Sequence, residues 1–158
     1  MAGGGLHVVL DGVEDPHNLG AIVRTAHAAG AAAIVIPERR AVGLTETVAR
    51  VAAGALAYLP VVRVTNIGRA LEELKEYGYW IYGLDESCKE RYDQVEFTKP
   101  SAIVLGAEGH GLHEHVAKRC DFLVRIPMAG GMGRGIASLN VSVAAGVMLF
   151  EWKRRQTE

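Results

Sequence analysis

Near its carboxyl end the chain reads IPM (126–128), then a glycine-rich loop, then SLNVSVAAGVMLFEW (138–152). The last stretch predicts a nearly all-apolar helix from about Ser138 to Trp152, yet its first turn carries Ser138, Asn140 and Ser142. A helix that is buried on most sides ordinarily begins with apolar residues. Polar groups here indicate that the helix N-terminus faces a cleft, where its N–H groups and side chains can bind a ligand.

Outward from this segment, short apolar runs alternate with helical patterns along the chain. Strands are predicted at His7–Leu10, Ala33–Ile36, Val61–Val64, Trp80–Leu84, Ala102–Leu105 and Phe122–Ile126. Helices are predicted from Leu19 to a stop at Gly30, and over Thr45–Ala53, Ile67–Tyr77 and His113–Arg119. The alternation predicts an α/β domain: a mainly parallel six-stranded sheet with helices on both faces. Ligands bind such sheets at the carboxyl ends of the strands, where loops 11–18, 106–111 and 127–137 are expected.

Length and composition indicate one compact domain, residues 6–158, after a flexible N-terminus or linker remnant at residues 1–5. The 158 residues are 49% hydrophobic, which excludes a disordered chain. Lys and Arg total 17 against 18 Asp and Glu, so a nucleic-acid partner would have to meet a local basic patch. Cys88 and Cys120 form no CxxC pair, which fits a reducing cytoplasm and argues against structural zinc. No apolar run is long enough to span a bilayer, so no membrane partner is expected.

Taken singly, the polar residues of the loops have ordinary explanations. Asn18 occupies a plausible helix N-cap position, and Arg24 can be a solvated helix charge, although its neighbours are apolar. Glu108 stands between two glycines, either as a turn residue or as a carboxylate held for acid–base work or for the amine of a ligand. None of these residues assigns a function alone.

The glycine-rich loops and the histidines exclude several familiar sites. Neither 106–111 (GAEGHG) nor 130–135 (GGMGRG) fits the dinucleotide fingerprint, and no phosphate-binding P-loop is present. A surface cluster is the favoured interpretation of His110, His113 and His115, since nothing completes a set of metal ligands. The local basic patches are Arg39–Arg40 and Lys153–Arg155, which suit phosphate contacts or plain solvation.

Three segments taken together resemble the SpoU (TrmH-type) family of RNA ribose 2′-O-methyltransferases, in the SPOUT superfamily. They are DPHNLGAIVRTAHAAG at 15–30, IVLGAEGHGL at 103–112, and IPM with SLNVSVAAGVMLFEW at 126–128 and 138–152. All three occur in the family's order, and the resemblance covers essentially the whole chain. Residues 45–67 are most similar to the branch that methylates rRNA guanosine.

The resemblance implies a carboxyl-terminal trefoil knot, S-adenosylmethionine bound within it without a metal, and a homodimer. Knots are nearly absent from other proteins, so composition alone would not predict one. The implied cofactor site comprises Leu105, Gly106, Glu108, Gly109, Ile126, Pro127, Met128, Ser138, Leu139 and Asn140. The implied catalytic residues are Asn18, Arg24, Glu108, Ser138 and Asn140.

The implied reaction moves a methyl group from a sulfonium to a ribose 2′-hydroxyl. The enzyme must align two partners, which is worth roughly 7–11 kcal/mol, and remove a proton from a weak acid. The family regards the counterpart of Arg24 as the base or its close neighbour, but guanidinium stays protonated above about pH 12. We therefore expect Arg24 to position the target phosphate and hydroxyl and to stabilise the developing alkoxide. Asn18 would orient Arg24 or the ribose, and Ser138 and Asn140 would shape the pocket mouth.

The glycine-rich loop departs from the family pattern. Nine residues, AGGMGRGIA at 129–137, separate Met128 from Ser138, and the usual loop is several residues shorter. The longer loop is either a natural expansion, with Arg134 touching RNA, or an engineered insertion. In both cases it is expected to affect the affinity for the cofactor.

The sequence is therefore interpreted as the catalytic domain of a dimeric methyltransferase that acts on large-subunit rRNA. Two alternatives stay open: a tRNA ribose 2′-O-methyltransferase, and a non-catalytic knotted RNA-binding protein with an altered cofactor loop. A generic nucleotide-binding α/β protein is disfavoured, because the phosphate-binding motifs are missing.

Overall fold

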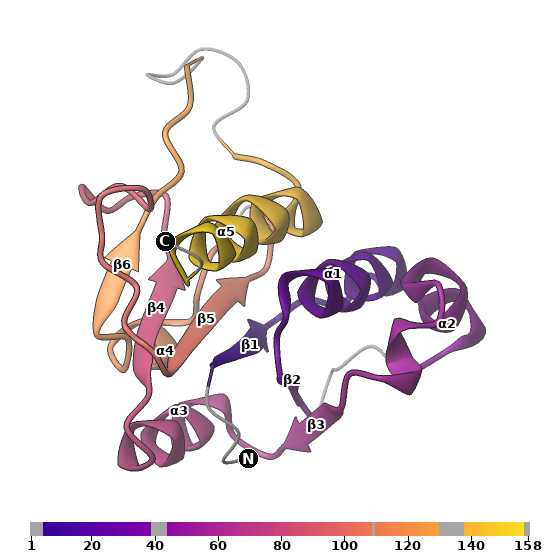
Figure 1. Cartoon of the computed structure of the whole chain (residues 1–158). Coiled ribbons are helices and arrows are strands. Elements are labelled where there is room, and N and C mark those ends of the chain that lie inside the picture. Colours follow the sequence, from indigo (N-terminus) through magenta and orange to yellow (C-terminus); the bar gives the residue numbers. More distant parts are fainter. Residues whose placement is uncertain (1–4, 39–43, 109, 130–137, 157–158) are drawn as a thin grey trace.

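The computed structural model describes residues 5–38, 44–108, 110–129 and 138–156 (Figure 1). The strands are β1 (Leu6–Asp11), β2 (Ala33–Pro37), β3 (Val61–Val64), β4 (Trp80–Leu84), β5 (Ser101–Gly106) and β6 (Phe122–Val124). The helices are α1 (Pro16–Ala29), α2 (Glu46–Ala52), α3 (Ile67–Glu76), α4 (Glu114–Ala117) and α5 (Val141–Gln156), with a short 3-10 helix at Ala55–Ala57.

All six strands form one parallel sheet in the order β3-β2-β1-β5-β4-β6. Strands β1 and β5 lie at its centre and pair along their whole length, from Leu6 beside Ser101 to Asp11 beside Gly106. The predicted parallel six-stranded α/β fold is thus confirmed. Because every strand runs the same way, the loops after β1, β4 and β5 emerge at one edge of the sheet.

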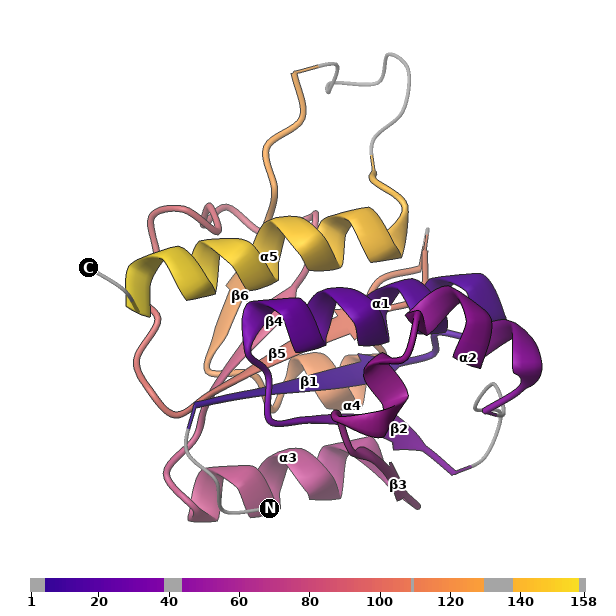
Figure 2. The ribbon, with the colours of Figure 1, turned by 45° about the vertical axis from the view of Figure 1, so that its right-hand side comes forward.

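Helices cover both faces of the sheet, as Figure 2 shows. Alternate side chains of the central strands divide the core in two. Leu10 and Leu105 pack with α1, α2 and α5 on one face, whereas Val9 and Val104 pack with α3 and α4 on the other. The near-continuous apolar strands of the sequence follow from this double burial.

The beginning of α1 corrects one prediction made from the sequence. Asp15, and not Asn18, is the N-cap: its carboxylate accepts hydrogen bonds from the N–H groups of His17 and Asn18. Pro16 occupies the first helical turn, where its missing N–H costs nothing. Gly30 ends the helix in the left-handed conformation, as predicted. Asn18 therefore has its side chain available for another contact.

The beginning of α5 lies later than predicted. The helix starts at Val141, and Ser138 and Leu139 belong to the chain that leads into it. Asn140 caps the helix, since its carbonyl accepts from the N–H of Ala144 at 2.9 Å and its Oδ1 accepts from the N–H of Ser142 at 2.9 Å. The polar residues of this segment thus include the cap itself.

Two buried side chains hold the connection between β4 and β5 in place. The hydroxyl of Tyr82, on β4, donates to the carbonyl of Glu96 at 2.8 Å and accepts from the N–H of Thr98 at 2.9 Å. The indole N–H of Trp152, on α5, donates to the hydroxyl of Ser101 at 3.0 Å. Residues 85–100 contain no helix or strand, as predicted, but their course is set by these partners.

Several sequence predictions concern residues outside those the structure describes. They include most of the N-terminal segment 1–5, the patch at Arg39–Arg40, and Arg134 within the long loop. The trefoil knot also stays a prediction, because residues 130–137 belong to the segment that would form it. Within the described part of the chain, no helix is long and apolar enough to cross a membrane.

Candidate functional site

Asn140 joins three segments that lie far apart in the sequence. Its Nδ2 atom donates to Oδ1 of Asn18 on α1 at 3.1 Å and lies 3.5 Å from Oε2 of Glu108 in the loop after β5. Its Oδ1 atom also accepts from the hydroxyl of Ser142. The cap of α5 thus gathers three of the five predicted catalytic residues, Asn18, Glu108 and Asn140.

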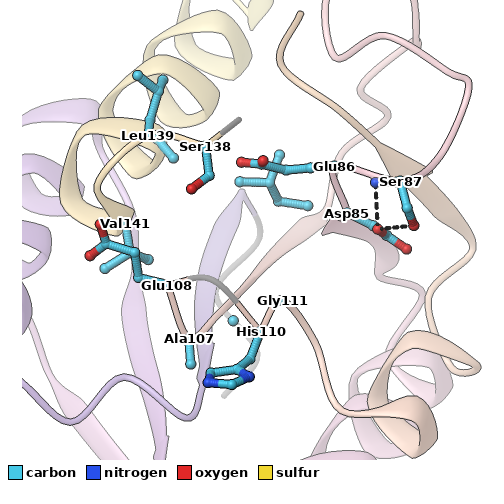
Figure 3. Close-up of a pocket in the computed structure, with 13 residues that line it drawn as sticks. Asp85, Glu86, Ser87, Ala107, Glu108, His110, Gly111, Ser138, Leu139 and Val141 are labelled. Atoms are coloured by element: carbon cyan, nitrogen blue, oxygen red, sulfur yellow. Dashed lines mark hydrogen bonds between the residues drawn. The ribbon is translucent and has the colours of Figure 1, made fainter. Parts of the chain in front are cut away.

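A cavity of about 430 Å³ opens beside this cluster. Three segments line it: the end of β4 with the loop after it, the loop after β5, and the beginning of α5 (Figure 3). Its lining residues are Leu84, Asp85, Glu86, Ser87, Gly106, Ala107, Glu108, His110, Gly111, Ser138, Leu139, Val141 and Ala144. The size and the carboxyl-end position are those expected of a small-molecule site in a parallel sheet.

The cavity contains part of the predicted cofactor set. Gly106, Glu108, Ser138 and Leu139 line it, and Asn140 bonds to the Glu108 side chain at its edge. The other five predicted cofactor residues are not among the described lining residues. Leu105 is fully buried in β5, Gly109 lies outside the described residues, and Ile126, Pro127 and Met128 are half-buried after β6 and are not among the described lining residues. Their contact with a cofactor stays a prediction.

Gly106 is a position where the backbone requires glycine. A Cβ atom there would lie 2.1 Å from the carbonyl oxygen of Gly111 and 2.7 Å from the N atom of Leu112. The loop after β5 therefore folds back directly against the end of its own strand, and Ala107 and Gly111 form an antiparallel bridge. This close approach presents main-chain groups and Glu108 to the cavity.

Arg24 lies apart from the cluster. It follows Asn18 by six residues on α1, which corresponds to about 9 Å along the helix axis and roughly 120° around it. Its side chain is exposed and makes no hydrogen bond or ion pair with any residue in the described ranges. The structure brings Asn18 into contact with Asn140 beside the cavity, whereas Arg24 is not among the described lining residues.

The loop after β4 was not predicted to contribute to the site. Sequence reasoning treated residues 85–100 as an irregular connection, although Leu84 ends a strand at the same edge of the sheet as Gly106. Asp85 follows it, and its Oδ1 accepts from the N–H of Ser87 at 2.9 Å and from its hydroxyl at 2.7 Å. The sequence does carry a signal for this loop. Parallel strands end at the same edge of a sheet, so the loop after β4 is expected near the loop after β5.

The charge of the cavity lining is predominantly negative. Asp85, Glu86 and Glu108 contribute carboxylates, His110 is the one basic type, and no Lys or Arg belongs to the described lining. Partial burial, with the nearby charge of Asp85 as a smaller cause, raises the pKa of Glu86 above its ordinary value. Such a lining suits a ligand that carries positive charge.

The chain is similar to known proteins over most of its length. The chain matches the model of the SpoU rRNA Methylase family over residues 5–150. It is 51% identical to YacO of Bacillus subtilis (strain 168), which is assigned to the TrmH family of tRNA/rRNA methyltransferases, over 94% of this chain and 58% of that protein. The chain thus spans less than two thirds of its relative's length.

Solved structures give the same result. The SpoU methyltransferase AviRb of Streptomyces viridochromogenes, in complex with the cofactor AdoMet, has a TM-score of 0.87 at 30% identity, over 97% of this chain and 61% of that one. A structure described as an RNA 2′-O ribose methyltransferase has a TM-score of 0.85 at 30% identity, over 98% of this chain and 57% of that one.

Proposed function

Because the chain belongs to the SpoU rRNA Methylase family, we propose that it transfers a methyl group from S-adenosylmethionine to a ribose 2′-hydroxyl of RNA. The observation that carries this proposal is the contact of Asn140 with both Asn18 and Glu108 at the edge of the cavity. Residues from three separate motifs thereby converge on one place, as a site for two substrates requires.

The cavity fits the cofactor in size, position and charge. Its volume of about 430 Å³ lies within the range of small-molecule pockets. Gly106 allows the main chain to approach a ligand closely, and the carboxylates of Asp85, Glu86 and Glu108 in the lining suit a ligand with positive charge. Gly106, Glu108, Ser138 and Leu139 would hold the cofactor, which supplies an activated methyl group when bound.

The chain's own groups would align the acceptor. Asn140 holds the side chains of Asn18 and Glu108 in one place, so the amide of Asn18 is oriented before RNA arrives. A hydroxyl held beside this cluster would lie near a methyl donor bound in the cavity, and alignment of two bound reactants lowers the barrier by roughly 7–11 kcal/mol. A guanidinium close to the acceptor would stabilise the alkoxide as the proton leaves.

Arg24 would provide that guanidinium to the site of a second subunit. Its exposed position, about 9 Å along α1 from Asn18, does not place it at its own cavity. Helix α5 packs beside α1, and two of its large apolar side chains, Val143 and Phe150, are 52% and 45% exposed. They lie seven residues apart, on one face of the helix. A homodimer formed through this face would bury them and bring Arg24 near the partner's cavity.

The RNA substrate we favour is a guanosine of large-subunit rRNA, since residues 45–67 are most similar to that branch. A tRNA ribose is the second candidate, because the assignment of the Bacillus subtilis relative names both kinds of RNA. The net charge of this chain is only −1, so its electrostatic attraction for RNA phosphates is weak. Tight RNA binding would therefore need a further basic surface.

The test begins with calorimetric titration of the protein with S-adenosylmethionine and with its demethylated product. Saturable binding near one per subunit, followed by transfer of labelled methyl groups to rRNA, is the expected result. Transfer to tRNA but not to rRNA would support the second substrate. A folded dimer that binds neither ligand would instead identify the chain as a non-catalytic RNA-binding protein.

A further inference from the structure

The loop after β4 places two acidic side chains, Asp85 and Glu86, in the cavity lining, and their contacts differ. Asp85 is engaged within the loop, because its Oδ1 atom accepts two hydrogen bonds from Ser87. Figure 3 shows the Glu86 carboxylate directed across the cavity towards Ser138. Glu86 makes no hydrogen bond or ion pair with the residues for which the structure gives positions.

The other carboxylate of the cavity is already engaged. Glu108, on the opposite side, lies 3.5 Å from the side-chain amide of Asn140 and belongs to the cluster described above. Glu86 is therefore the carboxylate of the described lining that makes no hydrogen bond within the protein, and its oxygens are left for the ligand. Since the described lining contains no Lys or Arg, no fixed cation neutralises Glu86.

The charge of the ligand changes during the proposed reaction. The donor has a sulfonium sulfur, with one positive charge, and loses that charge when the carbon–sulfur bond breaks and the methyl group bonds to the ribose oxygen. The hydroxyl proton is released, and the product is a neutral thioether at the same sulfur. A fixed carboxylate in the cavity attracts the first ligand more than the second.

We propose that Glu86 is a specificity-determining residue that makes the cavity bind the charged methyl donor more tightly than its neutral demethylated product. This inference rests on the proposed cofactor. The Glu86 side chain is exposed, so screening by water limits the effect of its charge and the expected difference in affinity is modest. Exchange of product for donor after each turnover would be favoured by the same difference in affinity.

The test compares three ligands by calorimetry on the full chain: S-adenosylmethionine, its demethylated thioether product, and an unreactive analogue with a protonated amine in place of the sulfonium. In Glu86→Gln, the affinity for both charged ligands is expected to fall by roughly three- to tenfold. The affinity for the neutral thioether is expected to change less than about twofold, because no charge faces the carboxylate.

Glu90→Gln is the matched control, since Glu90 is an exposed acid of the same loop and does not line the cavity. It should preserve the parent's ratio of affinities. An equal loss for charged and neutral ligands in Glu86→Gln, or no loss, would overturn the role of Glu86 while leaving the cofactor assignment intact. Absence of saturable binding by the parent protein would overturn both proposals together.

Discussion

The carboxylate of Asp11 accepts a hydrogen bond from the backbone N–H of His113 at 2.8 Å, and its other oxygen lies 2.8 Å from Nδ1 of the same histidine. Asp11 ends β1 and is only 5% exposed, whereas His113 follows the loop that carries Glu108. The pair therefore attaches the end of that loop to the end of a central strand. It explains how a glycine-rich loop can hold Glu108 in a defined place.

Replacing Asp11 by Ala should destabilise the protein and weaken cofactor binding. The backbone N–H of His113 would lose its acceptor in a partly buried place, which costs about 1–3 kcal/mol. Urea denaturation measures the first effect and calorimetry the second. The exposed neighbour Glu14 supplies a control, Glu14→Ala, which should stay within about 0.5 kcal/mol of the parent. Parent-like stability and affinity in Asp11→Ala would show that the contact does not support the loop.

Substituting Gly106 by Ala should disrupt the site and destabilise the fold by about 1–3 kcal/mol, because the new methyl group would meet the backbone of Gly111. A matched substitution exists in α5, where a Cβ on Gly146 would lie 3.8 Å from Thr25, an ordinary contact. Gly146→Ala should be neutral or stabilising by about 0.5–1 kcal/mol, since alanine favours the helix. Thermal unfolding measures the stability of both variants. Equal melting temperatures would contradict the close approach of the Gly111 backbone to Gly106.

Arg24→Ala should fold, dimerise and bind cofactor like the parent, yet lose RNA methylation by about 100-fold or more. The exposed side chain contributes nothing to packing, so the loss would come from the acceptor site. Single-turnover transfer of labelled methyl groups measures the rate. Arg50→Ala, which removes another exposed arginine on α2, controls for general RNA attraction. Normal turnover by Arg24→Ala would exclude the proposed role.

The mixing of Arg24→Ala with an Asn18→Ala variant extends this prediction. If each arginine serves the partner's cavity, heterodimers of two inactive variants contain one intact site and regain part of the activity. Failure of mixed and refolded subunits to regain any activity would place Arg24 within its own subunit's site.

Acidification should destabilise the protein through His7. This side chain is 1% exposed on β1, its ring meets Tyr79 edge-on at 4.9 Å, and burial lowers its pKa below the ordinary 6.5. The unfolded chain takes up a proton as pH falls below about 6.5, while folded His7 stays neutral until its own lower pKa. The free energy of unfolding therefore falls over that window and is largest above it.

Urea denaturation at a series of pH values measures this dependence. A His7→Phe variant should show a smaller loss between pH 7.5 and 5.5, because the buried group no longer titrates. The exposed His17 offers a control in His17→Gln, which should retain the parent's dependence. An unchanged slope in His7→Phe would mean that other groups cause the acid sensitivity.

Local features of the sequence predicted most of the secondary structure. Apolar runs marked the six strands, and Gly30 ended α1 as expected. The observed starts of two helices differ from the predicted ones, at places where neighbouring polar residues could each cap the helix. Asp15 capped α1 in place of Asn18, because proline follows it directly, and α5 began only after Asn140. Both shifts involve choices among neighbouring polar residues that local pattern does not resolve.

The candidate site was predicted in part, through resemblance and through polar residues in an apolar context. Sequence alone determined the parallel α/β fold and the family, since periodicity and motif order are properties of the linear chain. The resemblance to the family also predicted roles for Asn18, Glu108 and Asn140. Only the tertiary structure decided that Asn140 bonds to the other two, that Glu86 faces the cavity and that Arg24 does not. The reason is physical: these relationships depend on where strands end in a shared sheet and on how helices rotate about their axes, and packing across the whole domain sets both.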